Sequence, residues 1–123
     1  MKLLTALIAI LALSGCATWP RETVAEESTF LTLHAIDGMQ TANIQNTPHI
    51  YEAESAWAIG REPSSQSTTA YFAALAIAHV AVTDFMVCHH VNPWIIRTWE
   101  LVGIAWDMRD VTTNFSIGLA PTH

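Results

Sequence analysis

Apolar residues in this chain gather in long runs that carry few charges, and the runs are long enough to form helices. A short apolar stretch occupies 3–13. The next run begins near Thr23, which stands three residues before Glu26 in the pattern of a helix capping box. We expect that helix to continue to about Ile44, where a polar turn containing Pro48 ends it.

The most apolar stretch of the body covers 70–91, after a long polar connector, and it is long enough to cross a bilayer. Asn92 and Pro93 then predict the start of a third helix, because asparagine is a good N-cap and proline fits the first helical position. This helix would run from Trp94 to about Phe115. The turn before it is so short that the two helices must form an antiparallel hairpin. The sequence therefore predicts an all-α fold of about three main helices, with membrane insertion of the hairpin as one option.

Polar residues inside these apolar helices occur at helical spacing, so each set shares one face. The third helix carries Arg97, Glu100, Asp107, Asp110 and Asn114, the first carries His34, Asp37 and Thr41, and the second carries His79 and Thr83. Such groups are costly in apolar surroundings, so they should face one another or water. One interpretation is structural: an internal hydrogen-bond network in which Arg97 pairs with Glu100, or the solvated face of a soluble bundle.

The second interpretation is a divalent-metal site between the helices. Imidazole and carboxylate groups suit zinc, iron or manganese, and helical bundles place such ligands on facing helices. The candidate ligands are His34, Asp37, His79, Glu100 and Asp107. The chain has no HExxH, Glu-x-x-His or CxxC motif, and no serine in a GxSxG setting, so the sequence favours a role without catalysis.

Composition narrows the class of protein. Apolar residues make up 51% of the chain and charged residues 13%, about half the share of roughly 25% in globular proteins. This shortage of charge favours a membrane-associated or unusually buried body. The formal net charge of −6 offers no basic surface for nucleic acid.

The first 15 residues have the organisation of a secretory signal peptide, with Lys2, an apolar core and small residues before the cut. The following sequence, Leu13-Ser14-Gly15-Cys16, resembles the bacterial lipobox. In precursors with a lipobox the cysteine is acylated and becomes the first residue of the mature protein. Two or more acyl chains form a stable membrane anchor.

The lipobox resemblance implies a division of the chain into four parts. These are a signal peptide at 1–15, a lipidated linker at 16–22, one helical domain at 23–119 and a tail at 120–123. Membrane lipid would hold the protein in the bacterial cell envelope through Cys16. Ala17 is typical of export to the outer membrane, whereas an inserted hairpin would remain in the inner membrane, so the sequence leaves this choice open.

The body also resembles a family of small, uncharacterised helical membrane proteins and lipoproteins of bacteria. The matching residues are His34, Asp37, Gln40 and Thr41; Glu54, Gly60, Pro63 and Ser64; Tyr71, Phe72 and His79; and Asn114, Ile117 and Gly118. The family's Asn-Pro turn is replaced here by Ala56-Trp57 or Ser55-Ala56, depending on the alignment. The resemblance implies a helical, membrane-associated fold without a known activity, and it groups His34, Asp37, Glu54 and His79 in space.

The sequence thus predicts a lipid-anchored envelope lipoprotein with a structural or partner-binding role and no cofactor. A polar cluster would accompany it, formed by Glu54, Thr83, Arg97 and Asn114. The alternative is a metal-binding or enzymatic helical protein that uses a histidine–carboxylate cluster between its helices. Neither the ligand nor the partner protein in the envelope can be named from the sequence.

Overall fold

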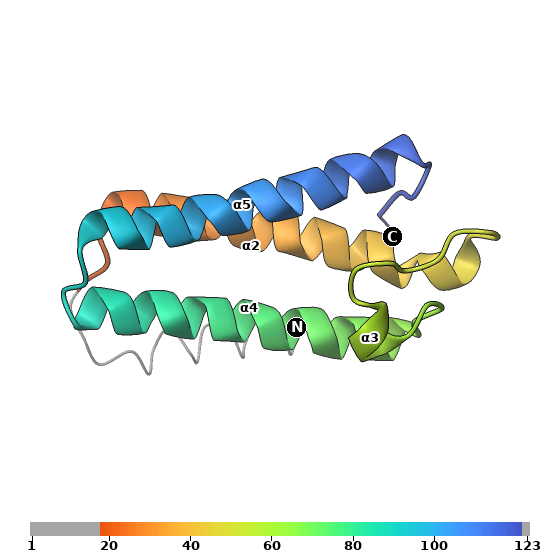
Figure 1. Ribbon diagram of the computed structural model, residues 1–123, viewed down its shortest axis with the longest axis horizontal. Helices are drawn as coiled ribbons and strands as arrows, with labels where there is room; N and C mark the ends of the chain where they lie inside the picture. The colour runs from red at the N-terminus through yellow and green to blue at the C-terminus, as the bar shows by residue number, and fades with distance from the viewer. Residues whose placement is uncertain (1–17, 122–123) are drawn as a thin grey trace.

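The computed structural model describes residues 18–121. Its elements are helix α2 (Arg21–Ala42), the 3-10 turn η1 (Ile44–Asn46), the short helix α3 (Ala56–Ile59), and the long helices α4 (Ser65–Cys88) and α5 (Pro93–Ser116). No strand occurs among the described residues. Figure 1 shows the three long helices side by side along the length of the molecule. The prediction of an all-α fold with three main helices is confirmed.

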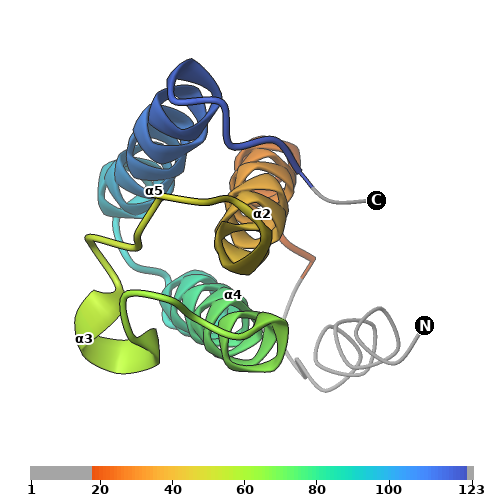
Figure 2. The ribbon, with the colours of Figure 1, turned by 90° about the vertical axis from the view of Figure 1, so that its right-hand side faces the viewer.

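Helices α4 and α5 form the predicted antiparallel hairpin. The Asn92 side chain accepts a hydrogen bond from the Trp94 N–H, and Pro93 occupies the first turn of α5, as the sequence indicated. Helix α2 runs in the same direction as α5 and packs along it most extensively, while α4 runs the opposite way (Figure 1). The end-on view in Figure 2 places the three helices at the corners of a triangle, with α3 outside it against α4.

Two helix starts differ from the prediction. Helix α2 begins at Arg21 without a side-chain cap, and Thr23 is a buried residue within the helix, so the predicted capping box is wrong. Helix α4 begins at Ser65 rather than near Ala70. Its earlier start follows from Ser64, whose side chain accepts a hydrogen bond from a backbone N–H of the first turn.

The interior of the bundle contains more polar than apolar side chains. The buried apolar residues are Phe30, Ile44, Ala76, Val80, Ile96, Val111 and Leu119. The buried polar residues are Thr23, Glu27, His34, Asp37, Gln40, Thr41, Ser55, Thr68, His79, Thr83, Glu100 and Asp107. The polar stripes of the three long helices therefore face one another, as expected for groups that are costly to leave in apolar surroundings.

Large apolar side chains instead cover the outer faces of α4 and α5. The exposed ones on these helices are Leu75, Ile77, Val82, Phe85, Trp94, Ile95, Trp99, Leu101, Val102, Trp106, Met108 and Phe115. Helix α4 is the one described helix that is long and apolar enough to cross a membrane. Only 17% of its most apolar stretch is buried within the bundle. Helix α5 does not meet the same criterion, so length and composition single out α4 rather than the whole hairpin. The predicted signal peptide and Cys16 lie outside the described residues.

Candidate functional site

Buried side chains of the three long helices form two layers along the bundle. The first layer consists of Glu27, His79 and Glu100, and the second of His34, Phe72 and Asp107. On each helix the members of the two layers are seven residues apart. This spacing returns a side chain to the same face of a helix, so the layers lie one above the other.

In the first layer, His79 is fixed between two aromatic rings. Its ring stacks on Phe30 and on Trp99, with centroids 3.7 and 4.6 Å away. Its Nδ1 lies 3.0 Å from Oε1 of Glu27 on α2. The two stacks set the plane of the imidazole and so direct Nδ1 toward the carboxylate.

Glu100 enters the same layer from α5 and has no exposed surface. The hydroxyl of Thr83 on α4 donates to its Oε1 at 2.7 Å, and Trp99 Nε1 donates to the Thr83 oxygen at 3.1 Å. This chain of donors orients the Glu100 carboxyl from one side only.

The first layer holds more buried acceptors than donors. Glu27 Oε2, His79 Nε2 and Glu100 Oε2 are all buried and have no hydrogen-bond partner among the described residues. One ligand atom from each of these residues can be chosen so that all lie within 4.8 Å of one another. Ionised carboxylates only accept hydrogen bonds, so a shared proton, a bound cation or another buried donor is needed between Glu27 and Glu100 to satisfy both.

The protonation of Glu100 reflects its burial beside the Glu27 carboxylate. Burial raises the pKa of Glu100 from 4.5 to about 8; the hydrogen bond from Thr83 opposes the shift and the Glu27 carboxylate adds to it. Near neutral pH the Glu100 carboxyl therefore carries a proton. A metal cation bound here would displace that proton.

The second layer is closed by hydrogen bonds of its own. His34 Nδ1 lies 3.0 Å from Asp107 Oδ2, and His34 Nε2 lies 3.1 Å from the carbonyl oxygen of Phe72. The carbonyl requires a donor at Nε2, and Nδ1 faces the carboxyl group of Asp107. Both nitrogens of His34 have partners, and His34 is therefore not positioned to bind a metal.

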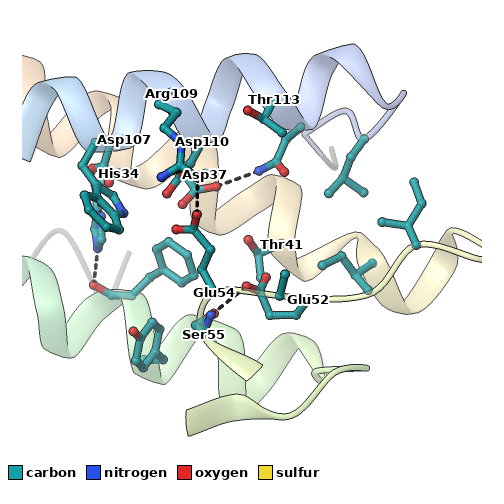
Figure 3. A pocket seen from close by; sticks show the side chains of 18 of the residues that line it. His34, Asp37, Thr41, Glu52, Glu54, Ser55, Asp107, Arg109, Asp110 and Thr113 are labelled. Atoms are coloured by element: carbon teal, nitrogen blue, oxygen red, sulfur yellow. Dashed lines mark hydrogen bonds and ion pairs between the residues drawn. The ribbon is translucent and has the colours of Figure 1, made fainter. Parts of the chain in front are cut away.

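A cavity of about 530 Å³ opens beside the second layer, between the three long helices and the segment 50–57 (Figure 3). Five acidic residues line it: Asp37, Glu52, Glu54, Asp107 and Asp110. Arg109 donates to Glu54 Oε1 at 2.8 Å, and both side chains are exposed. We call this space the acidic cavity.

Asp37 is the most buried acid that lines the cavity without a basic hydrogen-bond partner. Its Oδ1 accepts a hydrogen bond from Asn114 Nδ2 at 2.8 Å. Burial, and then the carboxylates of Asp110 and Asp107, raise the pKa of Asp37 to about 7. Burial and the neighbouring Glu54 raise the pKa of Asp110 to about 6.

The structure divides the five metal ligands proposed from the sequence. It brings His79 and Glu100 together and adds Glu27, which sequence reasoning missed. The available signal for Glu27 was its position seven residues before His34, on the same face of the first helix.

The other three proposed ligands do not join this centre. His34 and Asp107 pair with each other, and Asp37 lines the acidic cavity. The grouping implied by the family resemblance is likewise divided, because Glu54 lies at the acidic cavity with His34 and Asp37, while His79 lies in the first layer.

The two arginines of α5 have partners that the sequence did not indicate. Arg97 does not pair with Glu100; its Nε lies 3.3 Å from Oε1 of Glu26 on α2. Arg109, which is off the predicted stripe, reaches Glu54 in the connector. Glu100 therefore has no basic hydrogen-bond partner among the described residues.

Fold and site together define a protein of three long helices with a buried centre of two glutamates and one histidine. In the comparisons with known proteins, no family model, no curated protein and no solved structure matches the chain. The lipobox and the resemblance to small helical bacterial proteins therefore remain expectations from the sequence.

Proposed function

We propose that this protein binds a divalent transition-metal ion at the Glu27–His79–Glu100 centre, as a lipid-anchored protein of the bacterial cell envelope. The observation that carries the proposal is that one ligand atom from each of these three buried residues lies within 4.8 Å of the other two, while Glu27 Oε2 and Glu100 Oε2 have no hydrogen-bond partner among the described residues. Leaving a buried acceptor without a partner costs about 1–3 kcal/mol, and a cation bound between the carboxylates removes that cost.

The donor set determines which metals fit. Two carboxylates and one imidazole suit zinc, iron or manganese. His79 would coordinate through Nδ1, on the side of Glu27, because Nε2 lies against Gly103, where an added Cβ would be only 3.0 Å away. The three ligands come from three different helices, so the bound ion would also hold the bundle together.

A shared proton is the competing occupant of the centre. A proton on Glu100 that bridges to Glu27 would satisfy the same oxygens and leave a purely structural network. The two occupants respond differently to pH. Above pH 8 both carboxylates are ionised, so the centre retains a metal ion but loses the proton.

Metal analysis of protein purified without an affinity tag or chelator tests the proposal. We expect about one zinc, iron or manganese ion per chain in the wild type. His79→Ala should lower the content below about a tenth of that value, because it removes the only nitrogen ligand. His89→Ala is the matched control, since His89 is an exposed histidine beyond the end of the same helix.

The proposal fails if the wild type is metal-free as purified and stays so after incubation with each of these ions and dialysis. It also fails if both histidine variants lose metal equally. In the first case the centre is a protonated hydrogen-bond network.

The membrane anchor is a separate part of the proposal, supported by the lipobox and by the exposed apolar side chains of α4 and α5. The chain has two cysteines, and none of the described residues is a free cysteine. A Cys16 whose sulfur carries lipid cannot also bridge to Cys88, so a disulfide is the competing fate of that sulfur.

Intact mass under non-reducing conditions separates these fates. We expect the mature chain to begin at Cys16 with added acyl mass, and Cys16→Ser to abolish processing and acylation while Cys88→Ser preserves both. An unacylated chain with a disulfide would contradict the anchor. Carbonate extraction of membranes mixed with a chain that lacks residues 1–16 then shows whether α4 holds the body in the membrane, because this chain carries neither the lipid nor the apolar segment 3–13.

A second candidate function is that of a structural or partner-binding lipoprotein without a cofactor. The large exposed apolar side chains on α4 and α5 favour it, because apolar side chains that gather on a surface mark contacts with proteins or membranes. Crosslinking in the native envelope, followed by mass spectrometry, tests it. One reproducible protein partner, crosslinked through α4 or α5 residues, would support this function, and crosslinks to lipid alone would contradict it.

A further inference from the structure

Aromatic rings form much of the wall of the acidic cavity. The rings are those of Tyr51, Trp57, Tyr71, Phe72 and Trp106. Trp57 meets Tyr71 edge to face at 6.4 Å, and Tyr71 meets Phe72 in the same way at 5.5 Å. The face of an aromatic ring attracts ammonium and guanidinium cations, so rings beside carboxylates favour an organic cation.

The chain's own arginines show this chemistry on two of these rings. Cζ of Arg109 lies 5.6 Å from the ring centre of Trp106, and its Nη2 donates to Glu54 at 2.8 Å. Arg61 lies over the ring of Tyr51 in a similar way, at 5.2 Å. Arg109 thus already places a guanidinium group on a ring and a carboxylate of the cavity, and Arg61 places one on a lining ring although it does not line the cavity itself.

Two acids of the cavity have no such partner. Asp37 is 7% exposed and lines the cavity; its Oδ1 accepts from Asn114, and no described residue donates to its Oδ2. Glu52 lies across the cavity in Figure 3 and accepts a hydrogen bond from the backbone N–H of Ser55. Arg109 forms ion pairs with Glu54 and Asp110, and with no other acid among the described residues.

We propose that the acidic cavity binds an aliphatic polyamine, with one ammonium group on Asp37, another on Glu52, and the carbon chain along the rings of Tyr71 and Phe72. The volume of about 530 Å³ is within the range of small-molecule sites. The raised pKa of Asp37 agrees with a buried carboxyl that lacks a cationic partner. This site uses none of the ligands of the metal centre, so it goes beyond the proposed metal binding.

Calorimetric titration of the full chain with spermidine tests the proposal, with 1,8-octanediol as a neutral probe of similar length. At pH 8 and physiological salt we expect spermidine to bind, and the diol to bind at least about tenfold more weakly, because it makes no charge-assisted hydrogen bonds. Asp37→Asn should weaken spermidine binding about tenfold. Glu62→Gln, the same loss of charge at an exposed site outside the cavity lining, should leave the affinity unchanged.

Three outcomes would overturn the proposal. Equal binding of the diol would mean that the cavity recognises only apolar chains. If Asp37→Asn and Glu62→Gln lower the spermidine affinity equally, and thermal melting shows that both variants are folded, then the affinity depends only on the net charge of the protein. Loss of spermidine binding in Glu100→Gln would place the amine at the metal centre. Because Glu100→Gln removes metal binding but is expected to preserve spermidine binding, the two proposals fail independently.

Discussion

The Glu27–His79–Glu100 centre and the acidic cavity both contain carboxyl groups, but the protein encloses those of the centre, whereas those of the cavity border open space. At the centre the polar atoms are fully buried and aromatic rings cover the imidazole on both sides. In the cavity the acids border an open space of about 530 Å³. Burial raises the pKa in both places, of Glu100 to about 8 and of Asp37 to about 7.

The comparison shows that accessible space, rather than charge, distinguishes the two regions. A closed site between two carboxylates admits a proton or a bare metal ion, whereas an open site with aromatic walls admits an organic cation. Variants that change one region and preserve the other therefore separate the two functions.

The largest expected effect is the loss of metal binding in Glu100→Gln. We expect the zinc affinity at pH 8 to fall at least about a hundredfold, because an amide is a poor ligand and the centre keeps only two others. Competition with a chromogenic zinc chelator measures this. Asp110→Asn removes an acid of the cavity from the same helix and should leave the affinity unchanged; an equal loss there would show that only the overall charge matters.

The next effect is a fall in the stability of the metal-free protein as pH rises. The folded state holds Glu100 protonated up to about pH 8, whereas the unfolded chain ionises it near 4.5. The stabilisation is therefore complete below pH 4.5 and is lost as pH rises through about 8. We expect the melting temperature to drop by roughly 5–10 °C between pH 5 and pH 8.5. The drop should be smaller in Glu100→Gln and after zinc addition; equal drops in all three samples would contradict the account.

Two glycine substitutions give an effect of intermediate size. In Gly103→Ala the new Cβ would lie 3.0 Å from His79 Nε2 and 3.0 Å from Phe30, whereas in Gly38→Ala it would lie 3.1 Å from Phe72. Each clash costs about 1–3 kcal/mol, partly offset by the better helix propensity of alanine. Zinc affinity should fall several-fold in the first variant only, because only that clash displaces a ligand. A similar fall in Gly38→Ala would contradict the separation of the two regions.

The smallest effect is expected at the mouth of the cavity. Arg109→Gln removes an exposed ion pair with Glu54, so the free energy of unfolding should change by less than about 1 kcal/mol. Spermidine affinity should rise a few-fold, because a competing cation leaves Glu54 and Trp106. Arg97→Gln, which removes a pair at another site, should leave the affinity unchanged; a rise in both variants would reflect net charge alone.

Much of the fold could be predicted because its signals are local. Asn92 and Pro93 fixed the start of α5, and the short turn before them fixed the hairpin. The start of α2 could not be predicted in this way, because the helix begins at Arg21 without a side-chain cap and overrides the signal at Thr23.

The site could be predicted only in part, because helical periodicity defines a face and not the level at which two helices meet. The sequence therefore predicts His79 and Glu100 as members of the site. It does not show that Glu27 lies at their level, or that Asp37 lies at the level of Asn114. Contacts between a helix and a connector, such as the pair of Arg109 with Glu54, have no periodic signal at all.

The most direct test of the central claim is the number of protons released when zinc binds at pH 7. Calorimetric titration of the metal-free chain in two buffers of different ionisation enthalpy gives this number. The account predicts one zinc site per chain and release of about one proton, the proton that Glu100 holds below its pKa of about 8. Absence of zinc binding, or zinc binding without proton release, would contradict it.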